Sequence, residues 1–146
     1  MLPPPSDRKG GYAVSCGDGV GVPLVEEENK MLRTMLKSKI HRATVTEANL
    51  YYEGSITVDA DLIKAADIFE HEKVEVLNLN NGLRIETYVI TGKAGSGVIC
   101  LNGPAARGSC PGDQVIIVSY VTIEDKEARA IKARIIKVDD KNKIKE

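Results

Sequence analysis

In the segment YYEGSITVD, residues 51–59, a serine hydroxyl follows a glycine carbonyl directly, at Gly54-Ser55, within a run of residues that favour β-strands. Glycine weakens a strand interior and often marks a bulge or a point of close approach to the backbone. One interpretation is therefore a β-bulge or a short loop, and the other is that this peptide bond is itself reactive. The dipeptide recurs at residues 95–96 and 108–109, so the pair alone does not decide between them.

The bulk composition restricts the class of protein. The 146 residues suffice for one ordinary domain with a sizeable core. Lys plus Arg number 20 and Asp plus Glu 21, and a formal charge of −1 argues against a protein whose main task is to bind nucleic acid. Three cysteines without CxxC spacing and two histidines disfavour a disulfide framework or a metal site. Such cysteine usage indicates a reducing, cytoplasmic compartment.

Residues 1–30 differ in composition from the rest of the chain. They hold most of the six prolines, show no sustained periodicity and lack the apolar segment of a secretory signal. We expect a poorly ordered extension, a leader or tag, or a start set upstream of Met31. An ordered strand over 19–25 is the alternative. Residues 31–146 are expected to form the folded domain, and no apolar run approaches the roughly 18 residues of a membrane span.

Short strands dominate the pattern of this domain. Apolar and β-branched residues predict strands over 35–46, 55–59, 73–80, 83–92, 98–102, 114–123 and 133–139. Asn81-Gly82 can adopt the positive φ angles of a tight hairpin turn between two of these strands. Six or seven closely spaced strands with few helices predict an all-β fold, a closed barrel or a sandwich. A small barrel removes exposed edges, which suits a strand as apolar as 114–123.

Two short helices are expected among the strands. The first covers 59–72, where Asp59 or Asp61 can accept hydrogen bonds from the first free amides. The second covers one or two turns within 124–131. Residues 103–113, rich in Gly and Pro, are expected to form a loop.

Four motifs are spaced without large gaps along residues 31–121: MLRTMLKSKIHRATVTEANLYYEGSITVD, NGLRIETYVI, LNGPAAR and GDQVIIVSYV. Together they resemble the pyruvoyl-dependent aspartate 1-decarboxylases. The resemblance implies a double-psi β-barrel and a homotetramer with active sites between subunits. It also implies conversion of L-aspartate to β-alanine and carbon dioxide, which feeds pantothenate and coenzyme A synthesis. Residues 1–30 have no counterpart in it, and Pro104 stands where the family more often has alanine.

Decarboxylation of an α-amino acid leaves electrons on the α-carbon, and a cofactor normally accepts them. This chain has no dinucleotide-binding glycine motif, P-loop or metal cluster. The resemblance implies that it makes its own acceptor, a covalent pyruvoyl group derived from Ser55. Ser55 Oγ would attack the Gly54 carbonyl to form an ester. β-Elimination would then leave a β chain ending at Gly54 and an α chain starting at residue 55, and loss of ammonia would complete the group.

The strand that follows the Asn-Gly turn carries two further residues of the resemblance. Thr87 matches a threonine that hydrogen-bonds the scissile carbonyl and touches substrate, a contribution of roughly 3 kcal/mol in comparable sites. Tyr88 resembles the residue that returns a proton to the α-carbon. Neighbouring side chains of a regular strand point to opposite faces. We therefore expect both to reach one site only through a bulge or in adjacent subunits.

Basic residues and one loop complete the implied substrate site. Arg84 and Lys39 resemble residues that hold substrate carboxylate, and which of the two carboxylates Arg84 binds is open. Asn102 could polarise the reacting carbonyl. The substrate-contacting loop corresponds to Gly103, Pro104 and Ala105. Without the resemblance, the same residues would be interpreted as surface charges, β-formers, a core tyrosine and a Gly-Pro turn.

Two alternatives stay open. One is a small β-barrel binding module without catalysis, such as a DNA-binding regulator, which should have a basic face and no chain scission. It would also be indifferent to Ser55→Ala. The other is an unprocessed, inactive precursor, since cleavage can be spontaneous or can require a maturation factor.

Overall fold

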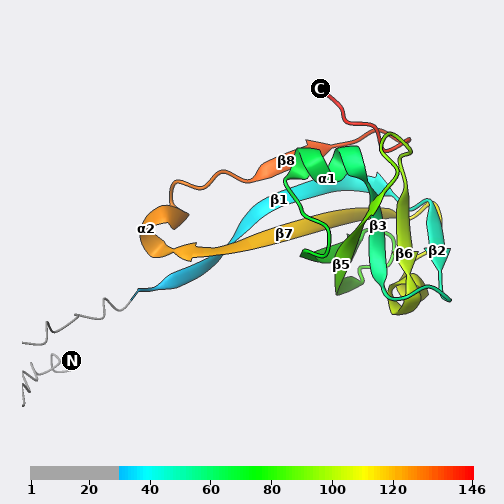
Figure 1. Ribbon diagram of the computed structural model, residues 1–146, viewed down its shortest axis with the longest axis horizontal. Coiled ribbons are helices and arrows are strands. Elements are labelled where there is room, and N and C mark those ends of the chain that lie inside the picture. The colour runs from blue at the N-terminus through cyan, green and yellow to red at the C-terminus, as the bar shows by residue number, and fades with distance from the viewer. Residues whose placement is uncertain (1–29) are drawn as a thin grey trace, which may run out of the picture.

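The computed structural model describes residues 30–146, which form a mostly β fold with few short helices (Figure 1). The strands are β1 (Leu32–Thr44), β2 (Glu47–Asn49), β3 (Ser55–Asp59), β4 (Lys73–Asn78), β5 (Arg84–Gly92), β6 (Ile99–Asn102), β7 (Gln114–Glu124) and β8 (Arg134–Lys137). The helices are α1 (Ala60–Ala66), the 3-10 helix η1 (Gly103–Gly108) and α2 (Asp125–Ala128). The predicted all-β class is confirmed. The expectations for the N-terminal extension and for a strand over 19–25 fall outside the described residues.

All eight strands belong to one mixed sheet, in the order β2-β6-β3-β5-β4-β7-β1-β8. β3 lies between β5, to which it is parallel, and β6, to which it is antiparallel. This arrangement is consistent with a β-barrel, and the double-psi connection stays a prediction. β1 and β7 continue beyond the body as a long antiparallel ribbon with α2 at its end (Figure 1).

The core is built from β-branched side chains that alternate with polar ones. Along β4, Val74 and Val76 are each 2% exposed, whereas Lys73, which precedes them, is exposed to solvent. The largest fully buried side chains are Ile40, Ile56, Leu62, Ile99, Leu101, Ile117, Val45, Val58, Val74, Val76, Val89 and Val115. Each contributes about 1.5–3 kcal/mol on burial. A shift of one residue in the pairing of a strand would turn all of its buried side chains toward solvent. Burial of this core therefore determines the strand register.

The helix predicted over 59–72 is too long, because α1 ends at Ala66. Asp67 takes a left-handed conformation with φ 54° and its N–H turns back to the carbonyls of Ile63 and Lys64. Such a residue ends a helix. Residues 67–72 therefore form a loop, and its contacts come from strands distant in sequence.

The hairpin predicted at Asn81-Gly82 is confirmed, but its turn is wider than two residues. β4 ends at Asn78 and β5 begins at Arg84. Gly82 has the expected positive φ of 73°, but Asn81 is not among the residues with positive φ. The side chain of Asn81 accepts a hydrogen bond from Leu83 N at 2.9 Å. The predicted loop over 103–113 likewise begins as the 3-10 helix η1, with a proline in its first turn.

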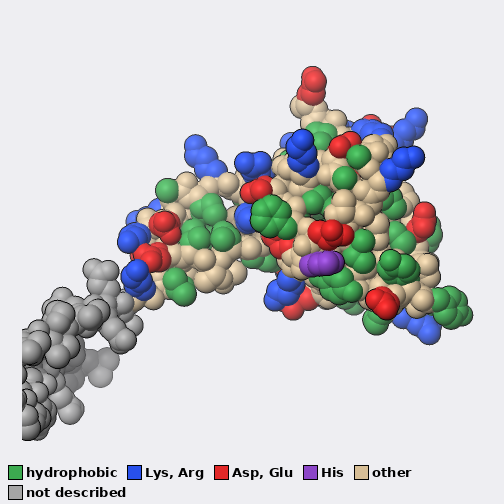
Figure 2. Space-filling view, in the orientation of Figure 1, with side chains coloured by type: hydrophobic (Ala, Val, Ile, Leu, Met, Phe, Trp, Pro, Cys, Tyr) green, Lys and Arg blue, Asp and Glu red, His purple; other side chains and the backbone are tan. Residues whose placement is uncertain are grey.

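Surface charge is mixed on the face shown in Figure 2, where acidic and basic side chains lie interspersed with hydrophobic ones. This matches the formal charge of −1. No helix within residues 30–146 has the length and apolar character needed to cross a membrane.

Asp59 joins α1 to the loop between β5 and β6. It is 1% exposed, and its Oδ1 accepts from Asp61 N at 2.9 Å and from Gly95 N at 3.0 Å. Its Oδ2 accepts from Gly97 N at 2.7 Å. Burial acts to raise the pKa of Asp59, but the hydrogen bonds from Gly97, Asp61 and Gly95 hold it below its ordinary value.

We expect Asp59→Asn to lower the free energy of unfolding at neutral pH by roughly 1–3 kcal/mol, because an ionised cap with three amide donors is lost. Since the folded pKa of Asp59 lies below the unfolded one, its stabilisation is complete above about pH 4. That stabilisation disappears as the pH falls through the lowered value. Urea unfolding at neutral and acid pH should therefore show a flatter pH dependence in the variant. Asp61→Asn, exposed in the same helical turn, is the matched control, and equal losses at both positions would contradict the assignment.

Candidate active site

A notch in the sheet lies where β3 begins. β3 starts at Ser55 and pairs with β5 only from Ile56↔Val89 onward. The earlier part of β5 is therefore open on that side, and the segment before Ser55 and η1 lie across the opening. A cavity of ≈ 360 Å³ occupies this position and is lined by Gly54, Ser55, Ile85, Glu86, Thr87, Tyr88, Asn102, Pro104 and Ala105.

This cavity brings together most of the residues predicted from the sequence. Thr87 and Tyr88 both line it, although the pairing of β4 with β5 runs from Lys73↔Tyr88 to Leu77↔Arg84 without a shift. No bulge therefore lies at these two residues, and the expectation that their side chains serve one site through adjacent subunits stays a prediction.

Ser55 is fully buried and its hydroxyl is hydrogen-bonded. Asn102 Nδ2 donates to Ser55 Oγ at 2.9 Å and to Thr57 Oγ1 at 3.0 Å. Ser55 Oγ in turn lies 3.5 Å from the carbonyl oxygen of Glu53, to which it donates. The β3–β6 register places Ser55 opposite Asn102, so strand pairing itself sets this contact. The arrangement holds a serine oxygen beside the Gly54 carbonyl, with an amide donor facing it.

Cys100 and Thr57 belong to the same cluster and were missed from the sequence. Cys100 Sγ donates to Asn102 Oδ1 at 3.2 Å. Burial, and then the nearby charge of Glu47, raise the pKa of the Cys100 thiol, which keeps the proton that this bond requires. The available signal was the period of two along a strand, which places Thr57 with Ser55 and Cys100 with Asn102.

The loop after β6 packs directly against Gly54. Gly103 has φ +59°, and a Cβ there would lie 2.8 Å from the Tyr52 carbonyl oxygen and 2.9 Å from Gly54 Cα. A Cβ at Gly54 would lie 3.4 Å from Pro104 Cδ. Pro104 stands in the first turn of η1, where a missing N–H costs no helical hydrogen bond. Residues 103 and 104 therefore confine the peptide before Ser55.

Arg84 lies on β5 but does not line the cavity. Its Nη1 donates to Glu75 Oε1 at 3.2 Å, and Tyr120 Oη donates to Glu75 Oε2 at 2.8 Å. Glu86 and Ile85, which do line the cavity, were not predicted. Glu86 lies midway between Arg84 and Tyr88 in the alternation of β5, so its side chain shares their face.

Lys39 is also outside the cavity. Lys39 on β1 pairs with Val118 on β7, Val118 pairs with Glu75 on β4, and Glu75 pairs with Glu86 on β5. Residues paired in this way share one face of a sheet. Three strand spacings of about 4.8 Å put the Lys39 backbone roughly 14 Å from β5. Within one chain, Lys39 therefore lies three strands from β5 along the sheet.

In this mostly β protein, the buried Ser55 at the start of β3 thus lines a cavity that Thr87 and Tyr88 also line. No three His, Cys, Asp or Glu side chains of residues 30–146 are grouped to hold a metal ion. The family model for aspartate decarboxylase matches residues 31–145. The chain belongs to the aspartate decarboxylase family, as its four motifs indicated.

Curated relatives named aspartate 1-decarboxylase support this membership. The protein of Pelotomaculum thermopropionicum is 62% identical over 80% of this chain and 88% of its own length. That of Acetivibrio thermocellus is 60% identical over 78% and 90%, and that of Syntrophus aciditrophicus is 59% identical over 79% and 99%. The relatives are enzymes by name, and the prediction that this chain is an enzyme is confirmed.

The free-energy cost of crowding a side chain at Gly103 can be measured separately from the cost of its left-handed backbone conformation. Gly82 has a similar φ of +73° but nothing within 4 Å of an added Cβ. We expect Gly82→Ala to cost about 1–2 kcal/mol for the left-handed conformation alone. Gly103→Ala should cost roughly 1–3 kcal/mol more, because the Gly54 segment must move. Urea unfolding of both variants in a Ser55→Ala background, which keeps the chain intact, measures the difference, and equal costs would argue against close packing at Gly54.

Proposed function

We propose that this chain is a precursor that cleaves itself between Gly54 and Ser55 and then converts L-aspartate to β-alanine and carbon dioxide. β-Alanine would supply pantothenate and coenzyme A synthesis in the cytoplasm. The observation that carries the proposal is the buried Ser55 hydroxyl, held 2.9 Å from Asn102 Nδ2 at the edge of the cavity that Thr87 and Tyr88 line.

Self-cleavage needs only groups of this chain. Ser55 Oγ adds to the Gly54 carbonyl carbon, the Gly54–Ser55 C–N bond breaks and an ester with a free amine results. Removal of the Ser55 α-proton breaks the Cβ–O bond, which releases the Gly54 carboxylate and leaves dehydroalanine at position 55. Water then replaces the nitrogen as ammonia leaves. Thr87 would donate to the oxyanion of the first step.

The pyruvoyl group formed in this way would supply the electron sink for loss of the α-carboxylate. The residues present fit it. Position 55 is anchored at the start of β3 by pairing with Asn102, and the keto oxygen would take the place of the Ser55 nitrogen. The group needs no space beyond that of the serine from which it derives.

Substrate roles follow the cavity. Tyr88 is 39% exposed, and its hydroxyl would hold the proton that the α-carbon receives. Backbone groups of Gly103, Pro104 and Ala105 would contact the substrate. Arg84 and Lys39 would bind its carboxylates through charge-assisted hydrogen bonds.

The positions of the two basic residues support an assembly with active sites between subunits, as a homotetramer would provide. Lys39 stands roughly 14 Å from β5 of its own chain by strand spacing. Both Lys39 and Arg84 lie on the outer face of the sheet, where a second subunit can bring them to Ser55. A single chain accordingly holds the self-cleaving part of the site and only part of the substrate-binding part.

Intact mass of the denatured protein tests the proposal directly. We expect two fragments, one ending at Gly54 and one starting at residue 55 that is lighter than its calculated mass by one ammonia. Ser55→Ala should remain a single species of 15.8 kDa. An uncut wild-type chain after prolonged warm incubation, alone and with a cell extract that could hold a maturation factor, would refute self-processing. An assay for β-alanine from L-aspartate then tests the substrate.

Co-expression of two inactive chains tests the shared site. Ser55→Ala retains Lys39, and Lys39→Ala retains Ser55, so mixed oligomers should regain activity on the order of a quarter of wild type if partners assemble at random. The mass spectrum must show that the Lys39→Ala chain is cut. Activity no higher than that of the separate variants, despite cleavage and mixing, would place Lys39 and the site in one chain or outside catalysis.

A further inference from the structure

The loop over residues 67–72 contacts β5 at and next to Tyr88. His71 N donates to the Val89 carbonyl at 2.7 Å, and Val89 N donates to the Glu72 carbonyl at 3.1 Å. The loop thus continues the pairing of β5 beyond Lys73↔Tyr88, the last pair of β4. The ring of His71 also meets that of Tyr88 edge to face, with centroids 6.2 Å apart and an angle of 74°. Both the ring of Tyr88 and the backbone that follows it therefore depend on this loop.

The conformation of the loop has to be imposed by its surroundings. Asp67 and His71 have φ angles of 54° and 67°, in the left-handed region that residues other than glycine adopt at a cost. Such a backbone persists only where contacts hold it. The loop has no helix or strand of its own between α1 and β4.

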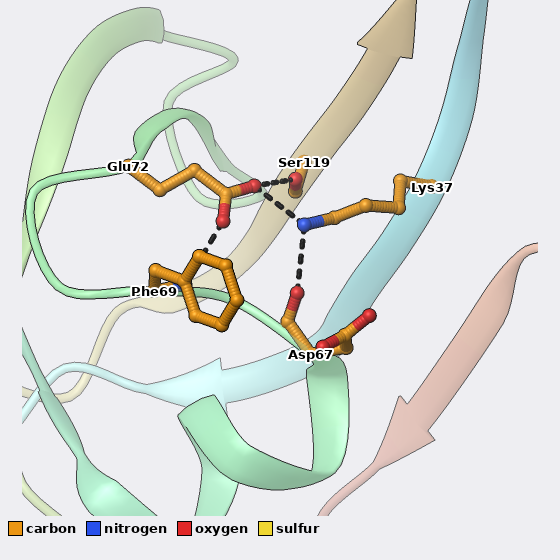
Figure 3. A network of polar contacts seen from close by, with 5 residues as sticks. All are labelled: Lys37, Asp67, Phe69, Glu72 and Ser119. Carbon is orange, nitrogen blue, oxygen red and sulfur yellow. Dashed lines mark hydrogen bonds and ion pairs between the residues drawn. The ribbon is translucent and has the colours of Figure 1, made fainter.

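Glu72 supplies those contacts (Figure 3). Its Oε1 accepts from Lys37 Nζ at 2.7 Å and from Ser119 Oγ, and its Oε2 accepts from Phe69 N at 2.9 Å. Lys37 Nζ also donates to the Asp67 carbonyl at 2.7 Å. One carboxylate therefore joins the start and the end of the loop to β1, through Lys37, and to β7, through Ser119.

The ion pair is shielded from solvent, with 21% of the Glu72 side chain and 24% of the Lys37 side chain exposed. Burial acts to raise the pKa of Glu72, but the hydrogen bonds from Lys37, Ser119 and Phe69 outweigh it and hold the pKa below its ordinary value. The carboxylate is thus charged at neutral pH, and charge-assisted hydrogen bonds of this kind are stronger than neutral ones.

We propose that Glu72 is a positioning residue for Tyr88: its carboxylate fixes the 67–72 loop to β1 and β7, and the loop holds the ring and backbone of the proton donor. The inference rests on the proposed role of Tyr88. Misplacement of a reacting group by about 1 Å can cost up to 10²-fold in rate. Among residues 30–146, no hydrogen bond or ion pair joins Arg84 or Lys39 to the loop. Loss of the clamp, which we define as Glu72 with Lys37, Ser119 and Phe69, should therefore affect turnover rather than substrate binding.

Whether Glu72 holds the loop can be tested in the uncleaved Ser55→Ala chain, with a measurement that does not depend on enzyme activity. Adding Glu72→Gln keeps the shape of the side chain and removes its charge. Amide hydrogen exchange at Val89, whose acceptor is the Glu72 carbonyl, should accelerate roughly tenfold or more as the loop opens. Glu124→Gln is the matched control, because Glu124 also has two lysine partners, Lys30 at 3.0 Å and Lys126 at 2.9 Å, at the end of the ribbon.

Kinetics of the processed enzyme test the consequence for Tyr88. We expect Glu72→Gln to lower kcat roughly tenfold while KM for L-aspartate stays within about twofold. In a Tyr88→Phe background the same change should have little further effect, because residues that act through one group are not additive. Ser119→Ala, which removes one donor of the clamp, should show the same pattern more weakly and serves if Glu72→Gln does not fold.

Unchanged Val89 exchange would overturn the clamp. A rise in KM with constant kcat, or an equal loss with and without the Tyr88 hydroxyl, would overturn positioning of Tyr88. A wild-type chain that never cleaves, or that forms no β-alanine, would refute the proposed function and with it the catalytic part of this inference. The exchange measurement in the Ser55→Ala chain would still decide whether Glu72 holds the loop.

Discussion

The structure around the Gly54-Ser55 peptide depends on the pairing of β3 between β5 and β6. Because β3 begins at Ser55, this residue is held by strand pairing while the segment before it leaves the sheet. The pairing also determines that Asn102 faces Ser55, at 2.9 Å, with its amide oriented by Cys100 on the other side. Backbone register thus brings a buried serine hydroxyl and an amide donor together beside the Gly54 peptide, and the side chains add only the last contacts.

Space around that peptide is controlled by glycine and proline. The close approach of Gly103 to Tyr52 and Gly54 leaves no room for a Cβ, and Pro104 lies against Gly54 from the first turn of η1. A proline in place of the usual alanine of the family is compatible with this helix start, because the missing N–H would have no helical partner there. Confinement of this kind limits how far the Gly54 carbonyl can move from the serine oxygen.

One buried and one partly buried carboxylate hold the loops on either side of β5. Asp59 binds the amides of the β5–β6 loop, and Glu72 binds the loop that contacts Tyr88. In both cases burial acts to raise the pKa of the carboxyl group, but the hydrogen bonds outweigh it and hold the pKa below its ordinary value. Both groups are therefore charged at neutral pH. Hydrogen bonds to these carboxylates, rather than regular secondary structure, therefore hold the loops that flank β5.

Local patterns along the chain were sufficient for much of this fold. Alternation of β-branched residues predicted the strands from β3 to β7, since burial of one face selects a period of two. Of the two predicted caps of α1, Asp59 and Asp61, the structure uses Asp59. The site residues Ser55, Thr87, Tyr88 and Asn102 were found through the family resemblance rather than through their own patterns. No single dipeptide or strand residue among them would have been distinguished from an ordinary structural one.

The helix over 59–72 was predicted too long because its end is set by contacts that no local window contains. Lys37 and Ser119, which bind Glu72, come from β1 and β7, and they stabilise a left-handed Asp67 where the sequence alone favours continued helix. The same limit applies to Thr57, Cys100 and Glu75, whose partners lie on other strands. The sequence by itself determined most of the strands, though not β2, and it determined the family and two candidate caps of α1, because burial, capping and motif spacing act over a few residues. Only the tertiary structure decided which side chains share the cavity, since strand order and register bring together residues that are tens of positions apart.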